Sequence, residues 1–278
     1  MQANTLQAAL AEALSADPGD DRIVCSTVGP VLWLRIERSA QHNALALSML
    51  DTIGTRLQAA ARVLKTHPDA VRLAVITGAG DQSFAAGGDL KELDAVRSEA
   101  QAQAMTERGM RALDAIRDFP QPVLAGLNGS ARGGGAELAL ACDWRVAHEQ
   151  AQIGLIQGQL ALSTAWGGGT DLFAQLGRGA ALKLLAEARL LEASEAVRLG
   201  LLDGCIAAAA AEFPAALEAY VERLARQPSQ VLRAHKRLAN RYSAALRRLC
   251  QEEESAQLVR TWTHEDHWQR AARALRSS

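Results

Sequence analysis

The sequence lacks an excess of either charge. It has 30 Lys and Arg against 31 Asp and Glu, a formal net charge of −1, which excludes a strong electrostatic attraction to nucleic acid or to an anionic membrane. No apolar run approaches the ~20 residues of a membrane span. The first five residues have neither the basic start nor the apolar stretch of a signal peptide. We therefore expect a cytoplasmic protein with no nucleic-acid partner and no membrane partner.

Cysteine is also scarce. The four cysteines lie far apart and form no CxxC pair or Cys/His cluster (Cys25, Cys142, Cys205, Cys250). This pattern excludes a disulfide framework or a zinc site as the organising feature. We expect no metal and no separate cofactor. We also expect none of the six histidines to be a catalytic base.

What is present is the pattern of an α/β protein. Of the 278 residues, 49% are apolar and 22% are charged, as in ordinary globular chains. Alternation around Gly29-Pro30 predicts a β-hairpin. Helical spacing over residues 48–64, 90–116 and 136–142 interleaves with short apolar, strand-like runs at 71–76 and 122–127. Strands that alternate with helices indicate an α/β core.

The pattern changes along the chain. Residues 1–20 contain a short helical stretch that stops at Pro18-Gly19, and we expect a loosely held N-terminal extension. Residues 21–205 form the predicted α/β core. Residues 206–278 carry helical patterns at 213–224, 229–238 and 243–262, which predict a helical C-terminal region. The arginine-rich part of this region is followed by acidic residues and is interpreted as a solvated helix face.

Two glycine-rich turns stand at strand-to-helix junctions, over residues 83–93 and 128–138. Glycine lets the backbone approach a ligand closely, and a helix N-terminus presents free N–H groups to negative charge. Two such turns can form an oxyanion hole from two backbone donors. Neither turn spells G-x-G-x-x-G or GxxxxGK[ST], which excludes a dinucleotide fingerprint or a P-loop.

Five segments carry a resemblance to a known family. They are FAAGGDLKEL (84–93), PVLAGLNGSARGGGAELALACDWRVA (122–147), IGLIQGQLALSTAWGGGTDL (153–172), EASEAVRLGLLD (192–203) and WTHEDHWQRAARAL (262–275). They closely resemble the enoyl-CoA hydratase/isomerase (crotonase) superfamily, in order and from about residue 23 to residue 275. The resemblance implies a ClpP-like spiral of ββα repeats and a C-terminal helical region that forms trimers, often paired into hexamers.

The chemistry that the resemblance implies is stabilisation of a thioester enolate made from an acyl-CoA substrate. Gly88 and Gly134 match the two glycines whose N–H groups hold the thioester oxygen, and Glu137 and Gln157 occupy the two positions of the family's acid/base residues. The remaining residues implied to bind substrate belong to an early turn, to the two glycine loops and to the later tryptophan segment (Asn43, Ala44, Ala86, Asp89, Leu90, Lys91, Gly133 and Trp166). For Asp89 we expect mainly a hydrogen bond that braces its loop.

One position departs from the hydratases of this family, which use two glutamates. Glu137 matches the first, and we expect it to act near the substrate α-carbon, but Gln157 replaces the second. An amide does not shuttle protons near neutral pH, and loss of one general acid or base removes ~10²–10⁴-fold of rate. Trp166 before a glycine pair, together with the missing glutamate, resembles the ethylmalonyl/methylmalonyl-CoA decarboxylase branch.

Three functions remain open. Decarboxylation of a short branched malonyl-type CoA is our leading hypothesis, because loss of CO2 creates the enolate without a base. In that reading Trp166 forms a wall of the acyl pocket, although core packing explains the residue equally well. The alternatives are an enoyl-CoA hydratase that uses Glu137 alone and a non-catalytic acyl-CoA binder.

Overall fold

Six strands form the larger of two β-sheets in the computed structural model, which describes residues 2–16 and 19–277. Its strand order is β1-β2-β3-β5-β7-β10, and every pair except the antiparallel β1–β2 hairpin is parallel. The strands are β1 (Ile23–Val28), β2 (Val31–Ile36), β3 (Leu73–Gly78), β5 (Val123–Leu127), β7 (Trp144–His148) and β10 (Gly204–Ile206). The predicted hairpin is present: Val28 pairs with Val31, and Gly29 turns with φ +55°.

The smaller sheet consists of β4 (Ser83–Ala85), β6 (Ser130–Arg132), β8 (Gln152–Gly154) and β9 (Leu191–Glu192). The chain visits the two sheets in turn. Each of β3, β5 and β7 in the larger sheet is followed by β4, β6 or β8 in the smaller sheet, and then by helix. This is the spiral of ββα repeats that the sequence predicted. The strands of the smaller sheet are too short to show a period of two in the sequence.

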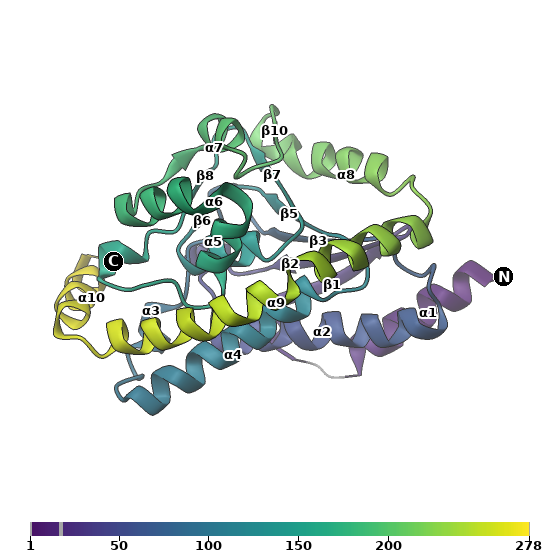
Figure 1. Cartoon of the computed structure of the whole chain (residues 1–278). Helices are drawn as coiled ribbons and strands as arrows, with labels where there is room; N and C mark the ends of the chain where they lie inside the picture. The colour runs from purple at the N-terminus through teal and green to yellow at the C-terminus, as the bar shows by residue number, and fades with distance from the viewer. Residues whose placement is uncertain (1, 17–18, 278) are drawn as a thin grey trace.

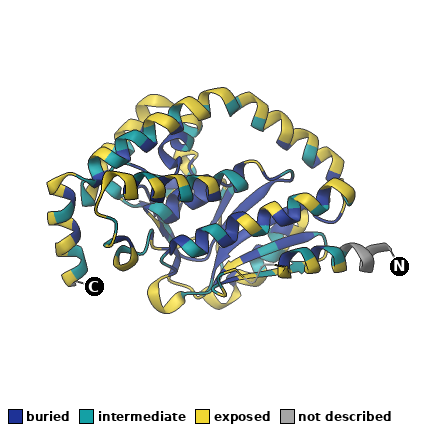
Figure 2. Cartoon of the chain, turned by 90° about the horizontal axis from the view of Figure 1, so that it is seen from below, coloured by how far each residue is buried: buried dark blue, intermediate teal, exposed yellow. Residues whose placement is uncertain are grey.

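Helices cover both faces of the larger sheet (Figure 1). One face packs against α2 (Leu47–Thr66) and α4 (Glu99–Arg117), through the β3 side chains Ala74 and Ile76. The other face packs against α8 (Phe213–Leu224), through Leu73 and Val75. Successive strand residues point to opposite faces, so a strand covered on both sides is apolar throughout. All residues of β3 and β5 are buried accordingly. Figure 2 shows the covering helices buried on one side and exposed on their outer side.

The remaining helices surround the smaller sheet and continue to the C-terminus. They are α3 (Leu90–Leu93), α5 (Gly134–Leu140), α6 (Gly168–Glu187), α7 (Ala193–Leu199), α9 (Ser229–Trp262) and α10 (Glu265–Ser277), with short 3-10 turns η1 (Ser39–Gln41), η2 (Gln157–Leu160) and η3 (Ala210–Glu212). Helix α9 runs alongside α4, and α10 packs against η2 (Figure 1). In the described part of the chain, no helix has the length and apolar character that crossing a membrane requires.

Three expected elements differ in detail. The helical pattern over 90–116 is split into α3 and α4, because Ser98 starts a new helix with a capping box to Gln101. The patterns at 229–238 and 243–262 are one continuous helix, α9. The N-terminal segment contains α1 (Gln2–Ser15), and the expectation that it is loosely held is wrong, because Leu10 and Leu14 are buried in the main core. The division into three domains stays a prediction.

Candidate active site

A cavity of about 690 Å³ lies where the two glycine loops, η2, α9 and α10 converge. Polar and charged side chains of the N-terminal half contribute to its lining (Arg38, His42, Asp89, Lys91, Arg132). Apolar side chains from five separate parts of the chain also line it (Leu90, Leu93, Met105, Ile156, Leu160, Leu162, Trp166, Leu258, Trp262, Leu275). A cavity with this combination suits a ligand that has a charged part and an apolar part.

The first glycine loop is held in place by Leu45. The Leu45 N–H donates to the Gly87 carbonyl at 2.7 Å, and the Leu45 carbonyl accepts from the Asp89 N–H at 2.9 Å. In such a bridge the amide of the residue between, Gly88, points to the opposite side. Gly87 has φ +108°, a conformation that favours glycine. The Gly88 N–H is therefore available on the cavity side of the loop.

The second glycine loop ends in the N-terminus of α5. Gly133 has φ +52° and donates its N–H to the Gly154 carbonyl at 2.9 Å, and Gly134 opens the helix. The first N–H groups of a helix have no partner within it. Within residues 2–16 and 19–277, no backbone acceptor receives the Gly134 or the Gly88 amide. The two loops adjoin, since a Cβ on Gly87 would lie 3.6 Å from the Gly134 nitrogen.

Glu137 lies one turn into α5, lines the cavity and is 1% exposed. Its carboxylate accepts backbone N–H bonds from Ala165 at 3.1 Å, from Trp166 at 2.6 Å and from Gly168 at 3.0 Å. Burial raises the pKa of Glu137 to about 7, the charge of Glu254 adds to this rise, and the backbone N–H groups oppose it. The carboxylate therefore anchors the turn of residues 165–168, a role that the sequence did not reveal.

Gln157 reaches Glu137 from η2. Its Nε2 donates to Glu137 Oε1 at 2.7 Å, whereas its Oε1 is buried and has no hydrogen-bond partner in the described part of the chain. Asp89 and Glu137 are the two carboxylates among the described residues that line the cavity. The predicted replacement of a carboxylate pair by a carboxylate and an amide is thus a feature of the site itself.

Asp89 is committed to its own loop. Its side chain accepts from the Lys91 N–H at 3.0 Å, which caps α3, and pairs with Arg38 at 2.6 Å. Burial alone would raise the pKa of Asp89, but the hydrogen bond and charge of Arg38 outweigh it and hold the pKa below its ordinary value. Asp89 is therefore ionised and braces the loop near neutral pH.

Trp166 packs beside both glycine loops. Its indole is 3% exposed and lines the cavity. A Cβ on Gly134 would lie 2.4 Å from Trp166 Cζ3, and a Cβ on Gly88 would lie 3.6 Å from Trp166 Cη2. The close approach requires glycine at position 134. The indole also reaches α4, where a Cβ on Gly109 would lie 2.2 Å from Trp166 Nε1.

Most of the predicted substrate-binding residues line this cavity (Ala44, Ala86, Gly88, Asp89, Leu90, Lys91, Gly133, Gly134, Trp166). Asn43 is not among the lining residues, and its contact with substrate stays a prediction. Asn43 is fully buried, donates to the carbonyls of Ala79 and Ser83, and accepts from the Arg38 N–H. Because its amide is hydrogen-bonded within the protein, Asn43 positions the turn that carries Ala44.

Sequence reasoning missed several residues of the site. Arg38, His42 and Arg132 line the charged part of the cavity, and Leu258 and Trp262 of α9 line the apolar part. Arg132 stands within the second glycine turn, a local signal that was available, whereas Arg38 and His42 lie more than 40 positions before the first turn. The α9 residues come from about 100 positions further along the chain, and only the tertiary structure brings them to the site. Among the described residues no group of three or more His, Cys, Asp or Glu side chains is placed to hold a metal ion.

Comparisons with known proteins identify the family. A family model described as Enoyl-CoA hydratase/isomerase matches residues 27–275. YngF of Bacillus subtilis, which bears the same family description, is 37% identical over 172 residues, covering 61% of this chain and 63% of its own. Crotonyl-CoA hydratase of Syntrophomonas wolfei is 35% identical over 170 residues, again covering 61% of this chain and 63% of its own.

The chain thus spans about three-fifths of the length of these curated relatives. A solved structure, an enoyl-CoA hydratase/carnithine racemase from Magnetospirillum magneticum, matches with a TM-score of 0.74 and 28% identity over 81% of this chain and 82% of its own. Since the family model covers most of the sequence, this chain belongs to the enoyl-CoA hydratase/isomerase family.

Proposed function

We propose that the protein converts a CoA thioester through an enolate held by the Gly88 and Gly134 N–H groups, and that it decarboxylates a short branched malonyl-type CoA. The observation that carries this proposal is the Glu137–Gln157 pair. Glu137 is occupied by three backbone donors, Gln157 is an amide, and Asp89 is paired with Arg38. The described residues that line the cavity therefore offer no free carboxylate to remove an α-proton.

Decarboxylation needs no such base. The bond between the α-carbon and the carboxylate breaks, CO2 leaves, and the electron pair moves into the thioester to give the enolate. Two fixed N–H donors stabilise the charge that develops on the thioester oxygen, and they favour the transition state over the ground state. A proton from water then adds to the α-carbon, which completes the balance.

The cavity wall supports a short acyl group. The Trp166 indole packs against both glycine loops and against α4, so it occupies space into which a longer chain would extend. An apolar wall also disfavours a carboxylate more than it disfavours neutral CO2. Both effects favour loss of CO2 from a small malonyl-type thioester.

A second candidate is an enoyl-CoA hydratase, which two observations favour. A pKa of about 7 suits Glu137 to general acid–base chemistry near neutral pH. Relatives include a protein named Crotonyl-CoA hydratase. In this case Glu137 alone would have to activate water and return the proton, and the hydrogen bonds that occupy its carboxylate would have to break.

We also propose that the chain assembles as a homotrimer or a dimer of trimers. Four exposed apolar side chains recur at helical spacing along α9 (Leu238, Tyr242, Leu246, Leu249). A stripe of this kind is typical of an interface. Light scattering on the purified protein measures the assembly directly.

The test of the reaction is a product assay by mass spectrometry on separate incubations with methylmalonyl-, ethylmalonyl- and crotonyl-CoA. We expect CO2 release and a saturated acyl-CoA from a malonyl-type thioester. Hydrated crotonyl-CoA with untouched malonyl thioesters would replace the decarboxylase by the hydratase. Binding of all three without turnover would identify a non-catalytic acyl-CoA binder.

A further inference from the structure

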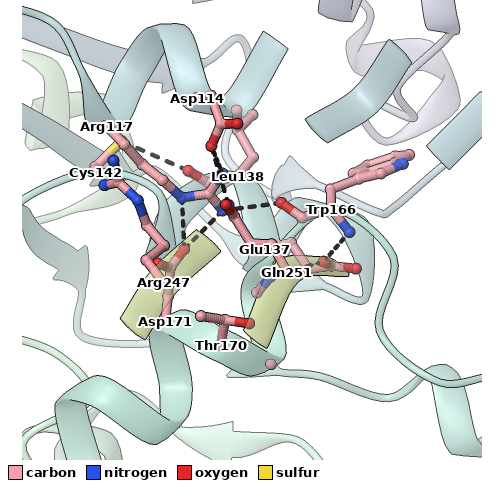
Figure 3. A network of polar contacts seen from close by, with 12 residues as sticks. Asp114, Arg117, Glu137, Leu138, Cys142, Trp166, Thr170, Asp171, Arg247 and Gln251 are labelled. Carbon is pink, nitrogen blue, oxygen red and sulfur yellow. Dashed lines mark hydrogen bonds and ion pairs between the residues drawn. The ribbon is translucent and has the colours of Figure 1, made fainter. Parts of the chain in front are cut away.

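Both backbone polar atoms of Trp166 are held by buried charged side chains. The Trp166 N–H donates to Glu137 Oε2 at 2.6 Å, and the Trp166 carbonyl accepts from Arg117 Nη2 at 2.9 Å. The two partners come from different helices, Glu137 from α5 and Arg117 from α4 (Figure 3). The backbone of Trp166 is therefore fixed from two sides.

Arg117 is itself tightly positioned. Its side chain is 3% exposed and does not line the cavity. Nη2 and Nε donate to Asp171 of α6 at 2.7 and 3.0 Å, and Nη1 donates to Asp114 at 2.9 Å (Figure 3). Gln251 of α9 donates to the same Asp114 oxygen at 3.0 Å. A planar guanidinium with a fixed fork of donors can satisfy these acceptors and the Trp166 carbonyl together, which an ammonium group cannot do.

The indole has no such anchor of its own. A buried tryptophan usually gives its ring N–H to an acceptor. Here Trp166 Nε1 is buried and has no hydrogen-bond partner among residues 2–16 and 19–277. The ring is held by packing against Gly88, Gly109 and Gly134. Its orientation therefore depends on where the backbone of residue 166 is fixed.

We propose that Arg117 is a positioning residue that sets the acyl-chain length the cavity accepts, acting through the Trp166 carbonyl from outside the cavity. The inference rests on the proposed function in one respect, that the cavity binds an acyl-CoA. With Arg117 in place the indole stays between the glycine loops and α4, and it excludes long chains. When the carbonyl is released, the indole gains freedom to move, and the apolar end of the cavity lengthens.

The test is binding of two saturated thioesters, butyryl-CoA and octanoyl-CoA, measured by calorimetry without any turnover. We expect the wild type to prefer butyryl-CoA, and Arg117→Lys to shift the ratio of the two dissociation constants at least fivefold toward octanoyl-CoA. Asp114→Asn is the matched control, because it disturbs Arg117 at Nη1, a nitrogen that the Trp166 carbonyl does not use. Its ratio should stay within twofold of the wild type.

A second variant addresses the acceptor itself and avoids any change at Arg117. Replacing the amide between Trp166 and Gly167 by an ester weakens the Trp166 carbonyl as an acceptor and removes a Gly167 N–H that donates to no backbone acceptor in the described part of the chain. This variant should shift the ratio in the same direction as Arg117→Lys. An unchanged ratio in both variants would overturn the proposal, and so would an equal shift in Asp114→Asn.

A spectroscopic readout separates this inference from the proposed function. The five tryptophans can be labelled with 5-fluorotryptophan, and Trp166→Phe identifies the signal of Trp166. We expect Arg117→Lys to move or broaden that signal and to leave the Trp33 and Trp144 signals in place. Failure of the wild type to bind either thioester would contradict the proposed function, whereas an unmoved Trp166 signal would contradict the role of Arg117.

Discussion

Gln157 Nε2 lies 2.7 Å from Glu137 Oε1 and donates a hydrogen bond to it. Two carboxyl groups at this separation would share a proton, because both cannot stay ionised so close together. An amide in place of one of them removes that repulsion and leaves Glu137 free to ionise. The pair is therefore unsuited to two-carboxylate proton transfer, which agrees with the enolate-stabilising role that we propose for the site.

Gln157→Glu restores a second carboxylate at this position. We expect crotonyl-CoA hydration to rise by at least tenfold, since a general acid or base contributes ~10²–10⁴-fold. Decarboxylation should fall, because a negative charge would face the leaving carboxylate. The measurement is kcat/KM for both reactions.

The matched control is Gln159→Glu, which adds the same charge on the same 3-10 turn at an exposed position that lines the cavity. It should leave hydration near the wild-type level. An unchanged or lower kcat/KM for crotonyl-CoA hydration in Gln157→Glu would contradict the view that the missing carboxylate at position 157 limits hydration.

Glu137→Gln tests the electrostatics of the buried carboxyl. The pKa of about 7 lies above the ordinary value of 4.5, so between these pH values the folded state binds more protons than the unfolded state. The free energy of unfolding must then fall as pH rises from 4.5 to 7, and level off above. The total is of the order of 3 kcal/mol.

Glutamine does not ionise, so the free energy of unfolding of Glu137→Gln lacks this fall with pH. Between pH 5 and pH 8 the wild type should therefore lose stability relative to Glu137→Gln, by the same order of free energy. Urea unfolding at several pH values measures the difference. Glu252→Gln, at an exposed position on α9, is the control and should follow the wild type. A difference that is constant with pH would show that the Glu137 pKa is not raised.

Gly109→Ala tests the packing of the indole against α4. The new Cβ would lie 2.2 Å from Trp166 Nε1 and 2.3 Å from Trp166 Cδ1, so the ring must shift. Overpacking of this kind costs about 1–3 kcal/mol. Gly179→Ala, where a Cβ has no neighbour within 4 Å, should instead gain roughly 0.5–1 kcal/mol. The midpoint of urea unfolding measures the stability of each variant. Recovery of stability in the double variant Gly109→Ala/Trp166→Leu would identify contact with the indole ring as the cause of the loss.

The oxyanion donors can be tested without adding a side chain. Gly134→Pro would remove the N–H but would also place a Cβ 2.4 Å from Trp166 Cζ3. An ester in place of the Gly134 amide removes the donor alone. We expect kcat to drop by about 10²–10³-fold, as for other single oxyanion donors. The same ester at Gly29, in the remote β-hairpin, should leave kcat unchanged, and full activity of the Gly134 ester would contradict the assignment of this donor.

The sequence predicted an α/β core and the positions of the two glycine loops because these rest on local signals, such as glycine at tight turns and apolar strand runs. The spiral of ββα repeats was an expectation from the family resemblance. The sequence could not predict that Glu137 anchors the 165–168 turn, since that depends on a loop 28 or more residues away. The bond between Arg117 and Trp166, 49 positions apart, is likewise absent from any local pattern.

The structural role of the Asn43 side chain was hidden from the sequence for a similar reason. The sequence alone does not decide whether the side chain of a polar residue in a turn beside a binding loop points into the cavity or into the protein interior. In the fold its amide is surrounded by the carbonyls of Ala79 and Ser83, which it satisfies. Buried polar groups require such partners, so the side chain turns inward and the neighbouring Ala44 faces the cavity.

We propose that the site stabilises an enolate but does not remove an α-proton. The decisive measurement is turnover of ethylmalonyl-CoA in heavy water, with the deuterium content of the butyryl-CoA product followed over time by mass spectrometry. We expect one deuteron at the α-carbon from the first turnover and no further exchange on prolonged incubation. Progressive incorporation of a second deuteron would reveal a protein base, and absence of CO2 release would contradict the decarboxylase outright.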